Sequence, residues 1–174
     1  MGVDKALLPY QGTSLLAHVA GVVRQVTASV AFIGDPSKYG HLGYAVYRDR
    51  LPSCGPMGGI HTALMESSTP WNLIVACDMP ALDPGILRLL VETAGRSPAA
   101  NCIIASRPDG DLEPLCAIYH KRATPLIRQA IERKLLKLKD LIPELKPTKL
   151  PVDVHSVLNV NTPADWAEFR EMPK

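Results

Sequence analysis

The chain has 174 residues, 47% of them hydrophobic and 21% charged, with a formal net charge of +2 at pH 7. A chain of this length can bury a hydrophobic core without disulfides or bound metals to stabilise it, and we expect one domain over residues 1–174. The weak charge argues against a nucleic-acid partner. No apolar run approaches the roughly 20 residues of a membrane span, and no signal-peptide core is seen at the N-terminus, so we expect no membrane association.

The metal-binding residue types show no ligand spacing. The four cysteines (Cys54, Cys77, Cys102 and Cys116) form no CxxC pair, and three of them lie in or beside apolar runs. Buried free thiols in a reducing cytoplasm explain them better than disulfides or zinc. The five histidines are equally scattered, and we expect surface or packing roles for them.

Helical and strand patterns alternate along the chain. In chain order, the sequence predicts a helix at 14–26, strands at 29–35 and 43–49, a helix at 60–67, a strand at 71–80, a helix at 83–94, strands at 101–106 and 114–120, a helix at 121–134, a strand at 152–160 and a helix at 161–172. Asp83 and Thr162 are the expected N-caps, each followed by Pro at the first helical position. The Pro-rich stretch 142–153 is interpreted as a surface loop.

This alternation predicts an α/β fold with a mostly parallel sheet covered by helices on both faces. The run "WNLIVACDMP" at 71–80 shows almost no alternation, so both of its faces should be buried. The run at 114–120 is the one expected to be antiparallel.

Polar residues follow several predicted strands, where ligands bind in such sheets. They are Asp35, Asp49, Asp78 and the stretch from Asn159 to Asn161. Asp78 ends the most apolar strand, and a half-desolvated carboxylate there would be costly without a partner. The partner could be Mg²⁺, which takes hard oxygen ligands, or the carboxylate could cap the next turn through backbone N–H groups.

Two further features could bind an anion. The cluster "GPMGG" (Gly55, Pro56, Met57, Gly58 and Gly59) comes just before a predicted helix and would expose backbone N–H groups to a nucleotide, or it could be a plain tight turn. Lys5 follows an N-terminal glycine and could meet phosphates, although a surface lysine is the alternative.

Five stretches occur in the order typical of one enzyme family: "MGVDKALLPYQGTSLL", "YRDRLPSCGPMGGIHTAL", "LIVACDMPAL", "LEPLCAIY" and "NVNTPADW". As a set, and over nearly the whole chain, they resemble the molybdenum cofactor guanylyltransferases, which are nucleotidyltransferases with a Rossmann-like fold. The "NVNTP" ending favours the guanylyl branch over the related cytidylyl branch.

The resemblance implies a role for each matching residue. Lys5 would touch the triphosphate, and Asp78 would hold the Mg²⁺ that bridges the nucleotide phosphates. Asp49 would lie in the guanosine-binding region, with the "GPMGG" cluster as the adjacent wall. Asn159 and Asn161 would line the pterin side. The implied reaction joins GMP from GTP to molybdopterin and releases pyrophosphate, and apo-molybdoenzymes are implied as partners.

Two departures from the family pattern stand out. The family begins with an apolar strand and a Gly-rich loop ending in Arg-Met-Gly, whereas here Met1 and Gly2 match only the end of that loop. We therefore expect a shortened sequence that lacks the first strand and the phosphate loop, which would leave unpaired backbone groups in the middle of the sheet. In addition, Gly34 and Asp35 stand where family members often carry Asn in the base region.

Two alternatives to this function stay open. The same mechanism could use CTP or a sugar phosphate instead. A chain without a phosphate loop could also be a non-catalytic module that carries finished cofactor to an apo-enzyme.

Overall fold

The computed structural model describes residues 4–171. Its strands are β1 (Pro9–Tyr10), β2 (Thr13–Ser14), β3 (Ala31–Ile33), β4 (Ala45–Tyr47), β5 (Trp71–Val75), β6 (Cys102–Ser106), β7 (Leu112–His120) and β8 (Thr148–Pro151). Its α-helices are α1 (Leu15–Arg24), α2 (Pro36–Tyr39), α3 (Gly55–Glu66), α4 (Pro84–Arg96), α5 (Thr124–Glu132), α6 (Leu138–Leu145) and α7 (Pro163–Glu171). Short 3₁₀ turns include η1 (Lys5–Leu7) and η4 (His155–Val157). Among the described helices, none combines the length and apolarity that a bilayer crossing requires.

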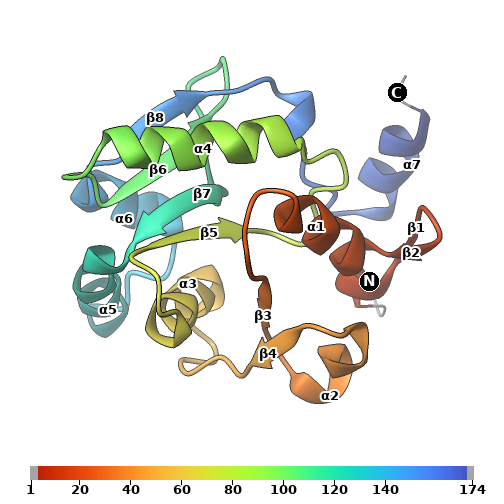
Figure 1. Cartoon of the computed structure of the whole chain (residues 1–174), viewed down its shortest axis with the longest axis horizontal. Helices are drawn as coiled ribbons and strands as arrows, with labels where there is room; N and C mark the ends of the chain where they lie inside the picture. The colour runs from red at the N-terminus through yellow and green to blue at the C-terminus, as the bar shows by residue number, and fades with distance from the viewer. Residues whose placement is uncertain (1–3, 172–174) are drawn as a thin grey trace.

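The main sheet has four strands in the order β5-β7-β6-β8 (Figure 1). β7 runs antiparallel to β5 and β6, while β6 and β8 pair in parallel. Three of the four strands therefore share one direction, and β7 opposes them. The predicted α/β fold and the predicted antiparallel strand are both confirmed.

A second, smaller sheet pairs β3 with β4 in parallel, and β1 with β2 forms a short antiparallel ladder near the start of the chain. Over residues 4–171, no ladder joins β3 to β5. The expectation that the first strand and the phosphate loop are missing stays a prediction, and Met1 and Gly2, on which it partly depends, lie outside the described residues.

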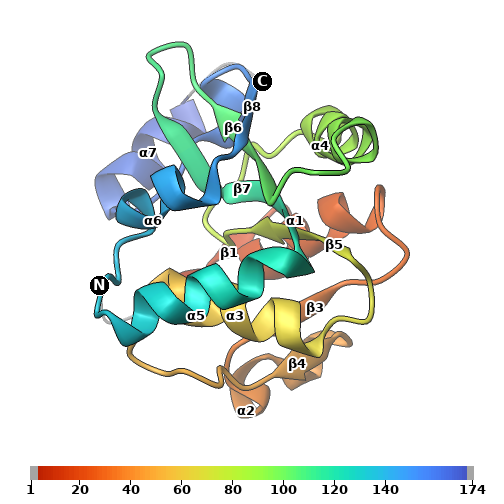
Figure 2. The ribbon, with the colours of Figure 1, turned by 90° about the vertical axis from the view of Figure 1, so that its left-hand side faces the viewer.

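Helices cover both faces of the four-stranded sheet (Figures 1 and 2). Alternate residues of β6 and β7 face opposite sides, as strand geometry requires. Ile103 and Ile118 pack in a core with α1 and α4, whereas Ile104 and Tyr119 pack in a second core with α3, α5 and α6. This two-sided burial explains why β6 is apolar from Cys102 to Ala105.

Three structural predictions are corrected. All five residues of β5 keep partial exposure, because β5 is an end strand of its sheet rather than a fully covered one. The stretch 142–153 is not a surface loop, since it contains the second half of α6 and all of β8. The stretch 152–160 is not a strand: after β8 the chain makes the turn η4 and continues without regular structure.

The predicted helix starts are confirmed by their capping bonds. The Oδ1 atom of Asp83 accepts a hydrogen bond from the N–H of Gly85 at 2.8 Å, and the Oγ1 atom of Thr162 accepts one from the N–H of Asp165 at 3.1 Å. Each bond satisfies an N–H group that has no partner within the helix. Local sequence chemistry therefore sets where α4 and α7 begin.

Candidate active site

Asp78 lies just beyond the carboxyl end of β5, and two backbone bonds fix its position. The N–H of Ala76 donates to the carbonyl of Leu115 at 2.9 Å, which extends the pairing of β5 with β7. The N–H of Val160 donates to the carbonyl of Asp78 itself at 2.8 Å. The C-terminal segment around Val160 is thereby held across the end of β5.

The carboxyl group of Asp78 is partly buried, and its Oδ1 atom is buried without a hydrogen-bond partner among the described residues. Burial raises the pKa of Asp78, and the nearby Lys5 ammonium lowers it in part. A buried carboxylate oxygen without a partner is the kind of ligand that a divalent cation takes. The described residues contain no group of three His, Cys, Asp or Glu side chains that could hold a metal ion. Asp78 therefore fits Mg²⁺, which usually keeps waters and substrate phosphates and needs only one or two protein carboxylates.

Lys5 is the first residue of the turn η1, and Asp4 is its N-cap. The Oδ1 atom of Asp4 accepts a hydrogen bond from the N–H of Ala6 at 3.2 Å. The Nζ atom of Lys5 donates to the Oδ1 atom of Asn161 at 3.2 Å. This bond joins residues 156 positions apart in the chain, so the predicted phosphate-binding lysine and a predicted pterin-side asparagine meet in space.

Asn159 and Asn161 belong to the irregular segment after η4, and the expected strand end is therefore wrong for them. Because Val160 is bonded to the carbonyl of Asp78, both asparagines are carried to the end of β5. The Nδ2 atom of Asn159 donates to the Oε2 atom of Glu113 at 3.2 Å. The structure thus brings both asparagines next to Asp78 without a strand.

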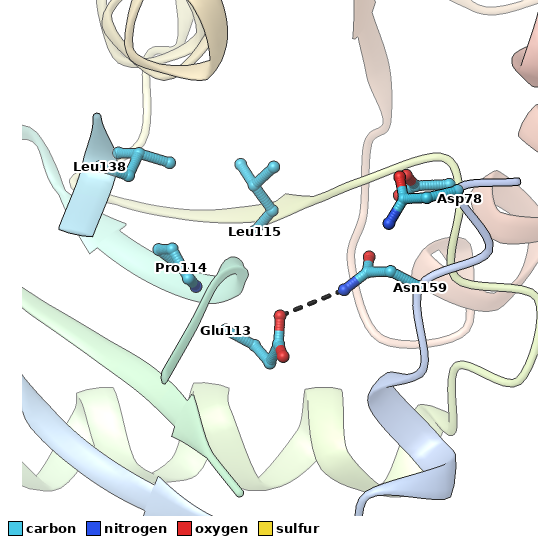
Figure 3. Close-up of a pocket in the computed structure, with 7 residues that line it drawn as sticks. Asp78, Glu113, Pro114, Leu115, Leu138 and Asn159 are labelled. Atoms are coloured by element: carbon cyan, nitrogen blue, oxygen red, sulfur yellow. Dashed lines mark hydrogen bonds between the residues drawn. The ribbon is translucent and has the colours of Figure 1, made fainter. Parts of the chain in front are cut away.

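A cleft of about 230 Å³ opens at this place (Figure 3). Its lining combines polar groups from three segments with an apolar wall: Asp78, Glu113, Asn159, Asn161, Pro114, Leu115 and Leu138. In Figure 3, Asn159 is drawn between Glu113 and Asp78. Pro114, Leu115 and Leu138 lie on the side of the cleft away from Asp78.

Sequence reasoning missed Glu113 as a site residue. Its signal was present, because a carboxylate stands at the second position of the otherwise apolar run "LEPLCAIY". A charged side chain that the fold buries in such a strand needs a polar or charged partner, and this requirement marks Glu113 as a candidate. Leu138 was also missed, since it lies in the lysine-rich run "KLLKLK" at 134–139, which is typical of a solvated face.

Asp49 lies outside the lining of this cleft and holds a loop against α3. Its Oδ1 atom accepts hydrogen bonds from the N–H of Leu51 and from the Oγ1 of Thr62, each at 2.9 Å. A Cβ on Gly58 would stand 2.5 Å from the carbonyl oxygen of Leu51 and 2.9 Å from the Oδ2 of Asp49. Glycine at position 58 is therefore what allows this loop to approach the helix.

The glycine cluster does not precede α3, as the sequence suggested, but forms its first turns. The helix begins at Gly55, whose φ of +56° is in the left-handed region that glycine tolerates. Pro56 follows in the first turn, where its missing N–H is not required. Gly59 has open space around it. The first-turn N–H groups that have no partner within a helix still belong to this cluster.

Asp35 has a local role in the structure. Its Oδ1 atom accepts a hydrogen bond from the N–H of Ser37 at 3.0 Å, which caps α2 and lowers the pKa of the carboxyl. Arg48 lies 3.6 Å from the same oxygen. The position between β3 and α2 is therefore explained by capping.

All four cysteines are free thiols, as expected, with Cys102 and Cys116 buried. Burial raises the pKa of each of these two to about 12, so neither is a reactive thiolate. Among the histidines, His61 departs from the expected satisfied packing. It is buried in α3, and its Nδ1 atom has no partner among the described residues.

Solved structures share this architecture. A protein from Archaeoglobus fulgidus described as molybdopterin-guanine dinucleotide biosynthesis protein A superposes with a TM-score of 0.79 at 22% identity, over 98% of this chain and 90% of that chain. A Mycobacterium tuberculosis protein solved as a complex with manganese superposes with a TM-score of 0.68 at 18% identity, over 95% and 90% of the two chains. The fold, with its acidic cleft at the strand ends, is that of an α/β nucleotidyltransferase.

Sequence comparison identifies the family. The family model described as MobA-like NTP transferase domain matches residues 1–148, and the chain belongs to this family of nucleotidyltransferases. A curated relative from Carboxydothermus hydrogenoformans, named "Probable molybdenum cofactor guanylyltransferase", is 33% identical over 97% of this chain and 88% of its own length.

Proposed function

We propose that the protein transfers GMP from GTP to molybdopterin, forming the guanine dinucleotide cofactor and releasing pyrophosphate. The observation that carries the proposal is the meeting of Lys5, Asp78, Asn159 and Asn161 at one end of the sheet. These are the residues that the family resemblance assigns to triphosphate, metal and pterin. The name of the Carboxydothermus hydrogenoformans relative supports the same reaction.

Charge neutralisation is the main requirement of this reaction, because both substrates are anions. Lys5 brings an ammonium group to the edge of the cleft and would bind the triphosphate as a point charge. Asp78 would hold Mg²⁺, which supplies Lewis-acid stabilisation of the phosphate charge when bound. The manganese complex of the Mycobacterium tuberculosis protein supports a divalent cation in this fold.

The attacking group needs no strong base, since the phosphate of molybdopterin is already ionised at neutral pH. Orientation and electrostatic stabilisation can then provide most of the rate. In the proposal, Asn159 and Asn161 orient the acceptor, and the bond from Lys5 to Asn161 keeps the ammonium beside them. Histidine or cysteine chemistry is not required.

The guanosine is assigned to the other side of the site. Gly55, Pro56, Gly58 and Gly59 form the wall for the nucleotide at the start of α3, and the glycine N–H groups of the first turn would bind it, since Pro56 carries none. Asp49 shapes this wall by holding residues 49–51 against α3. We further propose a cytoplasmic reaction, supported by the four free cysteines, and delivery of the product to apo-molybdoenzymes.

Pyrophosphate release tests the proposal directly. With GTP, Mg²⁺ and molybdopterin, the wild type should release pyrophosphate, and Asp78→Asn should lower kcat/KM by about 100-fold or more because one charge that binds the metal is lost. Asp83→Asn is the matched control, since Asn also caps helices and Asp83 is exposed at the start of α4. Wild-type rates in Asp78→Asn, or no pyrophosphate from the wild type, would refute the function.

A further inference from the structure

Glu113 is a partly buried carboxylate in the cleft to which the proposed reaction gives no role. It lies near the start of β7, and 13% of its side chain is exposed. Its Oε1 atom is 3.3 Å from the Nε of Arg107, and its Oε2 atom accepts a hydrogen bond from the Nδ2 of Asn159 at 3.2 Å. Contacts from two sides therefore fix the direction of the carboxylate at the cleft (Figure 3).

The surroundings keep this carboxylate in place. Burial raises the pKa of Glu113, while the Arg107 guanidinium and the Asn159 hydrogen bond lower it. Arg107 also lies 2.6 Å from Asp111, and Asp111 lies 3.7 Å from the ammonium of Lys139 beside α6. Arg107 is thus shared among carboxylates and does not neutralise Glu113 alone.

The remaining walls of the cleft suit a flat ring. Pro114, Leu115 and Leu138 supply apolar surface, Glu113 lies beside Pro114, and Asp78 lies toward the other end. The volume of about 230 Å³ is below the roughly 300 Å³ at which pockets for drug-sized ligands begin. One bicyclic heterocycle therefore suits the space better than a whole nucleotide does.

The carboxylate has hydrogen-bonding capacity left for a ligand. An ionised carboxyl group offers about four acceptor positions, and the hydrogen bond from Asn159 uses one of them, while Arg107 makes an ion pair that is not a hydrogen bond. Two parallel N–H donors on a planar group match a carboxylate best, as they do in guanidinium pairs. A pterin ring presents such an edge, formed by its 2-amino group and the adjacent ring N–H.

We propose that Glu113 binds the amino and ring N–H edge of the pterin and so determines which heterocycle enters the cleft as acceptor. This inference rests on the proposed function, because that function supplies a pterin substrate. Guanine carries the same donor edge, but Glu113 is hydrogen-bonded to Asn159 on the assigned pterin side, whereas the glycine cluster of α3 lies outside the cleft lining.

Ligand discrimination provides the test. Pterin and lumazine have the same ring system, but lumazine carries an oxygen in place of the 2-amino group. The wild type should bind pterin about tenfold to a hundredfold more tightly than lumazine in a fluorescence titration. Glu113→Gln should lose most of this preference, because the amide presents one acceptor and one donor instead of two acceptors.

Controls separate recognition from structure. A merely structural Glu113 would lower the affinity for both ligands equally and leave the preference unchanged, which would overturn the inference. Glu144→Gln on α6 is the matched control, since Glu144 pairs with Arg133 on the surface, and it should keep the preference. Equal binding of pterin and lumazine by the wild type would also overturn the inference, and that comparison needs no variant.

A comparison of two nucleotides shows whether Glu113 contacts guanine or the pterin. ITP lacks the 2-amino group of GTP, and the ratio of their affinities should be the same in the wild type and in Glu113→Gln. A change in this ratio with an unchanged pterin preference would assign Glu113 to guanine and refute the pterin assignment. Pyrophosphate release is measured separately, so a protein that discriminates pterin but does not use GTP would contradict the function and not the ring contact.

Discussion

β6 and β3 are both short apolar strands with a parallel partner, yet they differ in burial. All five residues of β6 are buried, because helices cover both faces of the four-stranded sheet. In β3, only Phe32 is buried, and Ala31 is exposed. The difference shows that the two sheets contribute unequally to the core.

The candidate active site takes residues that the structure holds in two different ways. Asp78 extends from β5, and its backbone is bonded to the C-terminal segment. Lys5 is placed by a short turn and by polar contacts of Asp4 and Asn161 near the surface. We therefore expect Asp78, the proposed metal ligand, to be held rigidly, and Lys5, the proposed phosphate-binding residue, to be held by weaker, more easily broken interactions.

The largest expected effect is a difference in stability between two isoleucines. Ile104 in β6 is fully buried, whereas Ile33 in β3 is partly exposed. Ile104→Ala should lower the free energy of unfolding by about 2–5 kcal/mol through lost burial and a residual cavity. Ile33→Ala should cost clearly less in the same urea titration. Equal losses would contradict the contrast between the two sheets.

A smaller effect is expected at the contact that supports Lys5. The hydroxyl of Tyr39 donates to the Oδ2 of Asp4 at 2.9 Å, and burial together with this bond raises the pKa of Tyr39 to about 12. Tyr39→Phe removes the hydrogen bond and should lower the free energy of unfolding by about 1 kcal/mol. It should also weaken GTP binding, because Asp4 caps the turn that begins with Lys5.

Tyr44→Phe is the control for this measurement. The ring of Tyr44 packs on Phe32 with centroids 4.9 Å apart, and within residues 4–171 its hydroxyl makes no hydrogen bond. This variant should change neither stability nor GTP affinity. If both phenylalanine variants behave alike, the contact with Asp4 does not support Lys5.

The smallest expected effect is a gain in stability, and it comes from a substitution of Asp78. Burial raises its pKa above the ordinary value of 3.8, so the folded state holds the proton more strongly than the unfolded state. Stability is then highest below that value and falls as the pH rises through the raised pKa. Asp78→Asn carries no charge to bury, so it should be slightly more stable than the wild type at pH 7, although much less active. Thermal unfolding at pH 4 and pH 7 measures the difference in stability. A variant less stable than the wild type at pH 7 would show that burial of the Asp78 charge does not destabilise the fold.

Local sequence chemistry predicted much of the fold. The apolar runs gave β5, β6 and β7, and the capping bonds of Asp83 and Thr162 show why α4 and α7 start where expected. The segment 142–153 was not predictable in the same way. Its prolines suggested a loop, but Leu145 is fully buried in the core with α3 and α5, and tertiary packing outweighs local preference there.

The residues proposed for the site could be named from the sequence, but their arrangement could not. Asp78 was proposed because a carboxylate follows an apolar strand, and it is partly buried in the structure. The meeting of Asn161 with Lys5, and the hydrogen bond from Asn159 to Glu113, depend on a segment without regular structure. Such a segment shows neither the helical nor the strand periodicity of hydrophobic residues. Its path across the end of β5 therefore could not be predicted from the sequence.

The most direct test of the central claim follows the α-phosphate of the nucleotide. The protein is incubated with Mg²⁺, molybdopterin and GTP labelled at the α-phosphate, and the pterin products are separated and counted. The account predicts that the label appears in a pterin dinucleotide, that label at the γ-phosphate appears in pyrophosphate, and that excess CTP does not compete. Label that stays in guanine nucleotides, or faster transfer from CTP, would contradict it.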